Sequence, residues 1–112
     1  MSDLDRKQIR KNFAEAVNIT ASEIEAWLKT PESRRVGSKK DGKSESVGHA
    51  SGRRIVAILG TKAADLSDSD YAHMRKVVGY VKRHRAQWPQ NIYTSRWRYS
   101  LMNWGHDPVK ED

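Results

Sequence analysis

The stretch Ser67–Pro89 constrains the fold most, because it carries the signals for one long amphipathic helix. Ser67 suits the N-cap position, and Asp70 three residues later completes a capping box and complements the helix dipole. Apolar residues then recur at helical spacing on one side, and Trp88-Pro89 predicts that the helix ends near Ala86. A helix with a single apolar face must pack that face against other elements, so the fold has to supply them.

The remaining segments also predict helices. Residues 1–30 contain two helical patterns, and the second begins at Thr20 and ends at Thr30-Pro31. Residues 46–60 form another, and a last helix is expected from about Tyr93 to Trp104, with Gly105 as its cap. No segment predicts a strand. We expect one all-α domain over residues 1–112, a compact domain of four or five helices with a mobile basic loop over 31–45 and a tail over 109–112.

Composition limits how this domain can be stabilised and where it acts. Leu, Ile, Val and Phe total only 20 of 112 residues, so the expected core depends on the four Trp and four Tyr. Helical spacing favours a core role for Trp97 and Trp104 over stacking on bases. The absence of cysteine excludes disulfides and thiolate metal sites, and no apolar run is long enough for a signal peptide or a membrane span. We expect a soluble cytoplasmic protein.

The predicted helix over 67–86 is basic on its outer side. The chain carries 21 Lys and Arg against 14 Asp and Glu, and the segment from Tyr71 to His106 contains seven basic residues and no acid. Four of these bases lie opposite the apolar side, with Gly79 among them, where a phosphate backbone could approach closely; the four are Arg75, Lys76, Lys82 and Arg83. Such a surface indicates a polyanion partner, although a solvated basic face is the alternative.

Two other segments allow two interpretations each. The segment Pro31–Ser46 is either a solvated linker or a basic arm that orders on phosphate. Gly48 and Gly52 either let another helix approach closely or shape an anion-binding turn beside Arg53 and Arg54.

The predicted last helix places three polar side chains on one face, namely Arg96, Tyr99 and Asn103. These residue types are common phosphate and base contacts, but structural packing is an equal alternative for Arg96 and Tyr99.

Evidence for a catalytic or metal centre is weak. Asp70 and His73 are three residues apart on one helix and could meet His106-Asp107, but Asp70 already has a capping role. No metalloprotease, phosphate-loop or nucleophile motif is present. We therefore expect no catalytic residue, no metal and no cofactor.

Three stretches, "ESVGHASGRRIV", "DLSDSDYAHMRKVVGYVKRH" and "SRWRYSLMNWGHDP", resemble a mainly bacterial family known as domain of unknown function 3140. The resemblance covers most of the chain, from about Asn18 to Lys110. It implies DNA binding, because members often carry that label, but it implies no established activity. The residues that fall in the shared stretches are His49, Arg53, Arg54, His73, Arg75, Lys76, Arg96 and Arg98.

These observations lead to a hypothesis of non-enzymatic binding to double-stranded DNA, mainly through phosphates and with little sequence specificity, in the cytoplasm or on the nucleoid. RNA remains an alternative ligand, and no membrane partner is expected. The candidate contacts are Arg53, Arg54, Arg75, Lys76, Gly79, Lys82, Arg83, Arg96, Arg98 and Tyr99, and the loop could add Arg34, Arg35, Lys39, Lys40 and Lys43. The alternatives are an adaptor whose basic face binds an acidic protein and a small metal-dependent enzyme.

Overall fold

The computed structural model describes residues 2–36, 46–87 and 96–110, and the described part of the chain is helical with no strand. The elements are α1 (Asp3–Ala16), α2 (Ala21–Leu28), α3 (Pro31–Arg35), α4 (Val47–Leu59), the 3-10 turn η1 (Ala63–Asp65), α5 (Asp68–Arg85) and α6 (Arg96–Asn103). The all-α prediction is confirmed. No helix among the described residues is long and apolar enough to cross a membrane.

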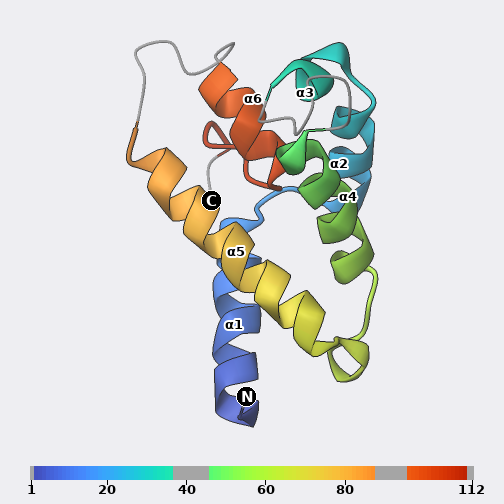
Figure 1. Ribbon diagram of the computed structural model, residues 1–112, viewed down its shortest axis with the longest axis vertical. Helices are drawn as coiled ribbons and strands as arrows, with labels where there is room; N and C mark the ends of the chain where they lie inside the picture. Colours follow the sequence, from blue (N-terminus) through green and yellow to red (C-terminus); the bar gives the residue numbers. More distant parts are fainter. Residues whose placement is uncertain (1, 37–45, 88–95, 111–112) are drawn as a thin grey trace.

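The helices form two packed pairs that α6 joins. Helix α1 crosses α5, and α2 lies beside α4 (Figure 1). Helix α6 contacts α2, α3, α4 and α5, so it lies between the two pairs. Two polar contacts support the first pair: Arg6 forms an ion pair with Asp68 at 2.9 Å, and Arg10 donates a hydrogen bond to the Tyr71 hydroxyl at 2.7 Å.

Side-chain caps fix where the helices begin. The predicted capping boxes are both present: Thr20 and Glu23 exchange hydrogen bonds at the start of α2, and Ser67 and Asp70 do so at the start of α5. Helix α5 also ends as predicted, with Ala86 as its C-cap. Local capping signals in the sequence therefore predicted these helix boundaries correctly.

The interpretation of 31–45 as one mobile loop is wrong for its first residues. Thr30 caps a short helix, α3, in which Pro31 occupies the first turn, a position where its missing N–H has no consequence. Ser33 is fully buried and Val36 is only 2% exposed. The same Thr30-Pro31 pair that ends α2 therefore begins α3, and residues 37–45 lie outside the described residues.

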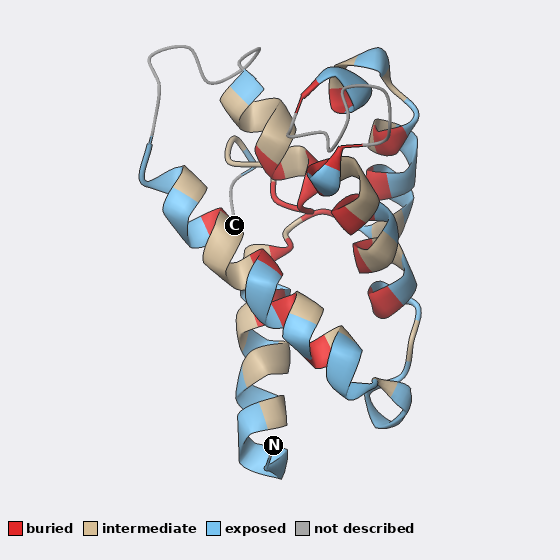
Figure 2. Cartoon of the chain, viewed as in Figure 1, coloured by how far each residue is buried: buried red, intermediate tan, exposed pale blue. Residues whose placement is uncertain are grey.

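The core lies where the two helix pairs meet, and its buried residues face inward from every long helix (Figure 2). On α5 the predicted apolar side is confirmed, because Met74, Val77 and Val81 are buried and Tyr71 joins them. Trp104 is buried and Trp97 packs against the cluster from its edge. The first turn of α1 does not join the core, since Leu4 is 79% exposed, and the buried residue of this helix is Phe13.

Helix α4 approaches α6 closely because it carries glycine at two contact positions. A Cβ on Gly52 would lie 2.6 Å from the Asn103 carbonyl oxygen and 2.8 Å from a Leu28 methyl carbon. Gly48 lies against Trp104 in the same way, at 3.0 Å from its indole Nε1. Both glycines are buried within α4, so the alternative of an anion-binding turn at these residues is wrong.

One buried side chain, Asn103, links four elements. Its Oδ1 accepts hydrogen bonds from the Trp27 indole at 2.7 Å and from the Ser33 hydroxyl at 2.5 Å, and its Nδ2 donates to the Ser33 carbonyl at 3.0 Å. Its backbone oxygen lies against Gly52. The expectation that Asn103 shares a surface face with Arg96 and Tyr99 is wrong, because the side chain is fully buried.

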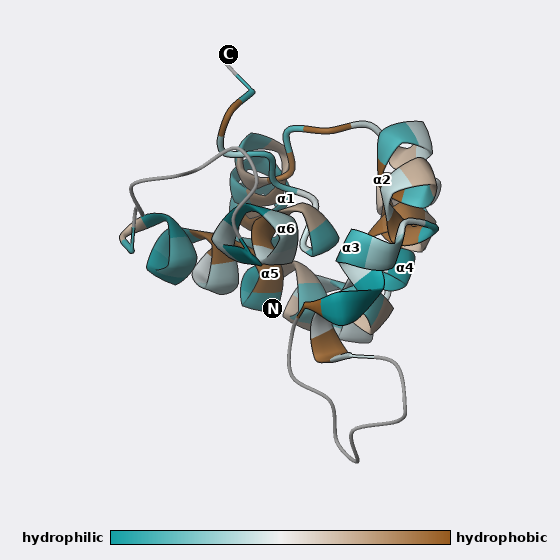
Figure 3. Cartoon of the chain, turned by 90° about the horizontal axis from the view of Figure 1, so that it is seen from above, coloured by the Kyte–Doolittle hydropathy of each residue, from teal (hydrophilic) through white to brown (hydrophobic). Residues whose placement is uncertain are grey.

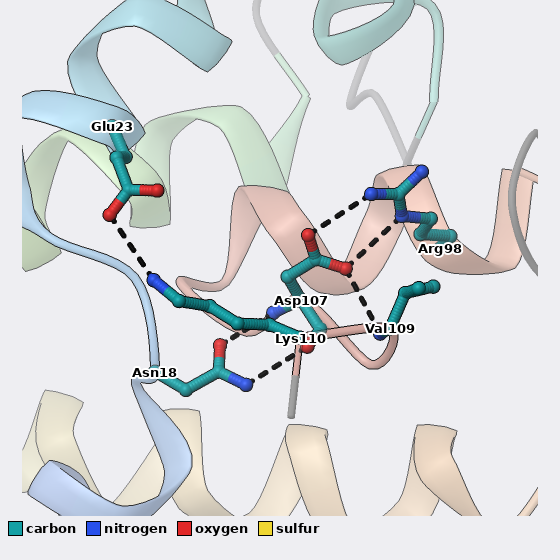
Figure 4. Close-up of polar contacts among 6 residues, drawn as sticks. All are labelled: Asn18, Glu23, Arg98, Asp107, Val109 and Lys110. Atoms are coloured by element: carbon teal, nitrogen blue, oxygen red, sulfur yellow. Dashed lines mark hydrogen bonds and ion pairs between the residues drawn. The ribbon is translucent and has the colours of Figure 1, made fainter. Parts of the chain in front are cut away.

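After α6 the chain reverses and is held by polar contacts. Gly105 has a φ of +80°, and the N–H groups of Gly105 and His106 donate to the carbonyls of Met102 and Leu101, which is a Schellman turn. The reversal brings Asp107 to Arg98, with both oxygens accepting hydrogen bonds at 3.1 Å (Figure 4).

The segment beyond this turn is also attached. Asn18 exchanges two hydrogen bonds with the Asp107 backbone, and Lys110 forms an ion pair with Glu23 at 3.3 Å (Figure 4). The predicted tail over 109–112 is therefore wrong at Val109 and Lys110, and the two residues after them lie outside the described part.

Gly52 provides a test of the close packing. We expect Gly52→Ala to lower the free energy of unfolding by about 1–3 kcal/mol, because the new methyl group meets backbone that cannot move aside easily. Gly79→Ala is the matched control: its nearest neighbour would be the movable Arg83 guanidinium at 3.1 Å. There alanine should leave stability unchanged or raise it by up to about 1 kcal/mol. Chemical denaturation measures both, and equal effects at the two sites would contradict the packing described.

The Asp107 contact predicts a pH dependence. Burial disfavours its charge, but hydrogen bonds from Arg98 and the Val109 N–H, with the charges of Arg98 and His106, outweigh it, so its pKa lies below the ordinary 3.8. A lowered pKa stabilises the fold above about pH 4 and loses this effect as pH falls through the folded value. We expect Asp107→Asn to cost about 1.5–3 kcal/mol near neutral pH.

Denaturation from about pH 7 down to about pH 3 tests this, because protonation should make the wild type resemble the variant and the difference should shrink. Asp65→Asn, at an exposed position, is the control and should change stability by less than about 0.5 kcal/mol at any pH. A difference between wild type and Asp107→Asn that persists undiminished at low pH would show that the carboxylate charge is not what stabilises the turn.

Candidate nucleic-acid interface

Helix α5 presents four exposed cations on the side opposite its buried residues. Hydrophilic and hydrophobic residues alternate along this helix (Figure 3). We call these four the α5 basic face; they are Arg75, Lys76, Lys82 and Arg83, and all are exposed. At 100° per residue they lie within about 120° of arc, and from the first to the last they span about 12 Å at 1.5 Å per residue. The predicted grouping of these side chains is therefore present.

The cations of the α5 basic face have no counterion among the described residues. Within residues 2–36, 46–87 and 96–110, no carboxylate pairs with any of the four. Lys82 and Arg83 lie in the last turn, where the helix dipole favours positive charge, but Arg75 and Lys76 lie in the middle of the helix, where it does not. The dipole therefore accounts for only part of this charge.

Gly79 lies within the α5 basic face but is not open. It is half-buried, and the position of a Cβ would be 3.1 Å from an Arg83 guanidinium nitrogen. The guanidinium therefore covers part of the glycine, so an anion approaching there meets Arg83 before it meets the backbone.

Helix α4 places one of its two arginines, Arg54, beside the start of α5. Arg54 donates to the Ser69 hydroxyl at 2.6 Å and pairs with Asp70 at 3.4 Å, while Arg53 is exposed. Between the helices, the His73 ring is 2.8 Å from the Ser51 hydroxyl. Burial lowers the pKa of His73, and the charges of Arg54 and Lys76 lower it further. The positive charge here thus comes from arginine and lysine and not from histidine.

The candidate residues of α6 have structural contacts. Arg98 is held by Asp107, and the Tyr99 ring packs on Trp27 with centroids 5.3 Å apart. Arg96 is exposed and donates to the Arg35 carbonyl at 3.2 Å, at the end of α3. These contacts explain why basic and aromatic residues occur in α6 without a ligand.

The arm proposed from the sequence is only partly described. Arg34 and Arg35 are exposed in the last turn of α3, where cations also complement the helix dipole. The other three candidate residues lie outside the described residues; they are Lys39, Lys40 and Lys43.

The histidines and acids that could have formed a metal site do not gather. His73 contacts Ser51, the His106 ring is 2.7 Å from the Ala16 carbonyl, and Asp70 caps α5. In the parts of the chain that the structure describes, no group of three His, Cys, Asp or Glu side chains could hold a metal ion.

A pocket of about 410 Å³ beside the α5 basic face was not found from the sequence. It lies between the start of α4, the middle of α5 and the end of α6, and Lys76 and Arg83 contribute to it together with Tyr80 and Trp104. Its residues come from three separate helices, so no local motif could have indicated it.

Comparison with known proteins identifies the family. A family model described as "Protein of unknown function (DUF3140)" matches residues 12–102, which include the end of α1, all of α2 to α5 and most of α6. The match begins earlier than the resemblance noted in the sequence and ends before Asp107. No curated protein and no solved structure matches the chain. The chain therefore belongs to the family described as Protein of unknown function (DUF3140).

Proposed function

We propose that this protein binds double-stranded DNA through the α5 basic face, by contacts to phosphates and without reading the base sequence. The observation that carries the proposal is the set of four exposed cations on one side of a rigid helix, none paired with a carboxylate of the described residues. Unpaired like charges repel one another, and a polyanion removes that repulsion while releasing its own counterions.

The geometry of α5 favours a duplex over a small acidic patch. The four cations span about 12 Å, close to the width of the major groove of B-form DNA, so they could contact phosphates on both sides of it. Gly79 and the point charges around it offer little for recognising base edges, since Arg83 lies over the glycine.

The alternative partner is an acidic protein surface, which the same cations would attract. Duplex DNA is favoured because the cations follow one straight helix and because α5 itself carries no large exposed apolar side chain; those of the described residues are Leu4, Val47 and Leu59, on α1 and α4. Protein interfaces usually have an apolar centre, whereas phosphate recognition needs only charge.

The test uses the charges of the α5 basic face that lie away from the pocket. With about four phosphate contacts, log affinity for a random duplex should fall against log salt with a slope near −3.6. Arg75→Gln/Lys82→Gln should flatten this slope by about 1.8 units, at about 0.9 per lost contact. Both positions are exposed, so stability should change by less than about 0.5 kcal/mol at each.

The control removes the same charge elsewhere. Lys7→Gln/Lys11→Gln changes two exposed lysines on α1 and should keep the wild-type slope. A second duplex of unrelated sequence should bind with the same affinity. If the wild type shows no duplex binding even at low salt, or if an acidic polypeptide binds more tightly than DNA does, the proposal fails and an acidic protein becomes the better partner.

A further inference from the structure

The pocket beside the α5 basic face has the size of a small-molecule site. Its volume of about 410 Å³ falls within the range of ligand pockets in proteins, about 300–1,000 Å³. Three helices form it, so its shape depends on tertiary packing and not on a single loop. Because Lys76 and Arg83 border it, a ligand there would use two cations of the α5 basic face.

A row of stacked rings gives the pocket a firm, mostly apolar wall. Tyr80 of α5 stacks on Trp104 with centroids 4.3 Å apart, and His84 stacks on the other face of Tyr80 at the same distance. The Tyr80 hydroxyl and a His84 ring nitrogen are 3.1 Å apart. Each ring is held by its neighbour, so the wall is formed before any ligand arrives.

The positive charge at the border of the pocket comes from Lys76 and Arg83. Burial lowers the pKa of His84, and the charge of Arg83 lowers it further, which disfavours a charge on that ring. Burial raises the pKa of Tyr80, which keeps its hydroxyl protonated. The pocket thus combines an apolar wall with two fixed cations at its border.

The wall of the pocket also carries a hydrogen-bond donor. Trp104 as a whole is only 4% exposed, but its indole Nε1 is not one of the fully buried unpaired nitrogens, and no described residue accepts a hydrogen bond from it. This atom lies beside Gly48, where a Cβ would come within 3.0 Å of it, and both residues line the pocket. An accessible indole N–H in the wall of a pocket can donate to an acceptor on a ligand.

We propose that this pocket binds a small aromatic anion, with its ring against Tyr80 and Trp104 and its negative group between Lys76 and Arg83. An oxygen or nitrogen acceptor on the ligand would meet the Trp104 indole. Phosphate and carboxylate groups on aromatic molecules share this chemistry. The proposal does not depend on DNA binding, although a ligand in the pocket would withdraw two cations from the α5 basic face.

Three related probes separate the parts of this proposal. Adenosine monophosphate has a ring and an anion, adenosine has only the ring, and inorganic phosphate has only the charge. Each is titrated into the full chain without DNA, and the indole N–H signal of Trp104, assigned with a Trp104→Phe variant, is followed by nuclear magnetic resonance. We expect the nucleotide to move this signal saturably, and the other two to bind at least about tenfold more weakly.

Two variants on the same helix give the matched comparison. Lys76→Gln/Arg83→Gln should weaken nucleotide binding by at least about tenfold, as expected for losing hydrogen bonds to charged groups. Arg75→Gln/Lys82→Gln removes equal charge outside the pocket and should keep the affinity within about twofold. This second variant is expected to weaken DNA binding while leaving the pocket unchanged, so the two proposals can fail separately.

Three results would overturn the pocket proposal. Phosphate alone could bind as tightly as the nucleotide, which would mean that the rings contribute nothing. The two double variants could lose affinity equally, which would mean that overall charge governs binding. The nucleotide could leave the Trp104 signal unmoved while shifting others, which would place any binding elsewhere.

Discussion

The buried amide of Asn103 is the interaction on which the arrangement of this protein depends. It pairs with the Trp27 indole of α2 and with the hydroxyl and carbonyl of Ser33 in α3, while its own backbone oxygen lies against Gly52 of α4. A buried polar group is costly unless it is paired, so this network allows only one placement of α6 relative to its neighbours. That placement brings Trp104 to the ring of Tyr80 and starts the turn at Gly105 that returns the chain to Asn18.

The charges of α5 divide along its length in a way that the fold explains. At its first turn, Asp68 pairs with Arg6 of α1 and Asp70 pairs with Arg54 of α4, so the acidic end of the helix is used to hold it in place. The later turns carry cations with no such role among the described residues. The two acids at the start of α5 thus form internal contacts, and an excess of positive charge remains on one face of the helix. A polyanion would be attracted to that face.

Local sequence signals predicted the helices well, but they could not predict the contacts between residues far apart in the chain. The caps at Thr20 and Ser67 depend on residues three positions apart, and the apolar side of α5 follows helical spacing, so both were predictable. The role of Asn103 could not be predicted, because its hydrogen-bond partners are 70 and 76 residues away in the chain. The pairing of Arg98 with Asp107 could not be predicted either, because it depends on the turn at Gly105. Of the candidate site, the α5 basic face could be predicted and the pocket could not.

The row of rings across α5 and α6 also gives the protein an optical signature. Trp104 lies between His73 and Tyr80, with centroid distances of 6.1 and 4.3 Å and nearly parallel planes. Aromatic side chains held in a fixed asymmetric environment produce a near-ultraviolet circular dichroism signal that is lost when tertiary packing loosens while helices persist. Since Tyr80 belongs to α5 and Trp104 follows α6, this pair contributes to the near-ultraviolet signal through the contact between those two helices, whereas the far-ultraviolet signal reports the helices themselves.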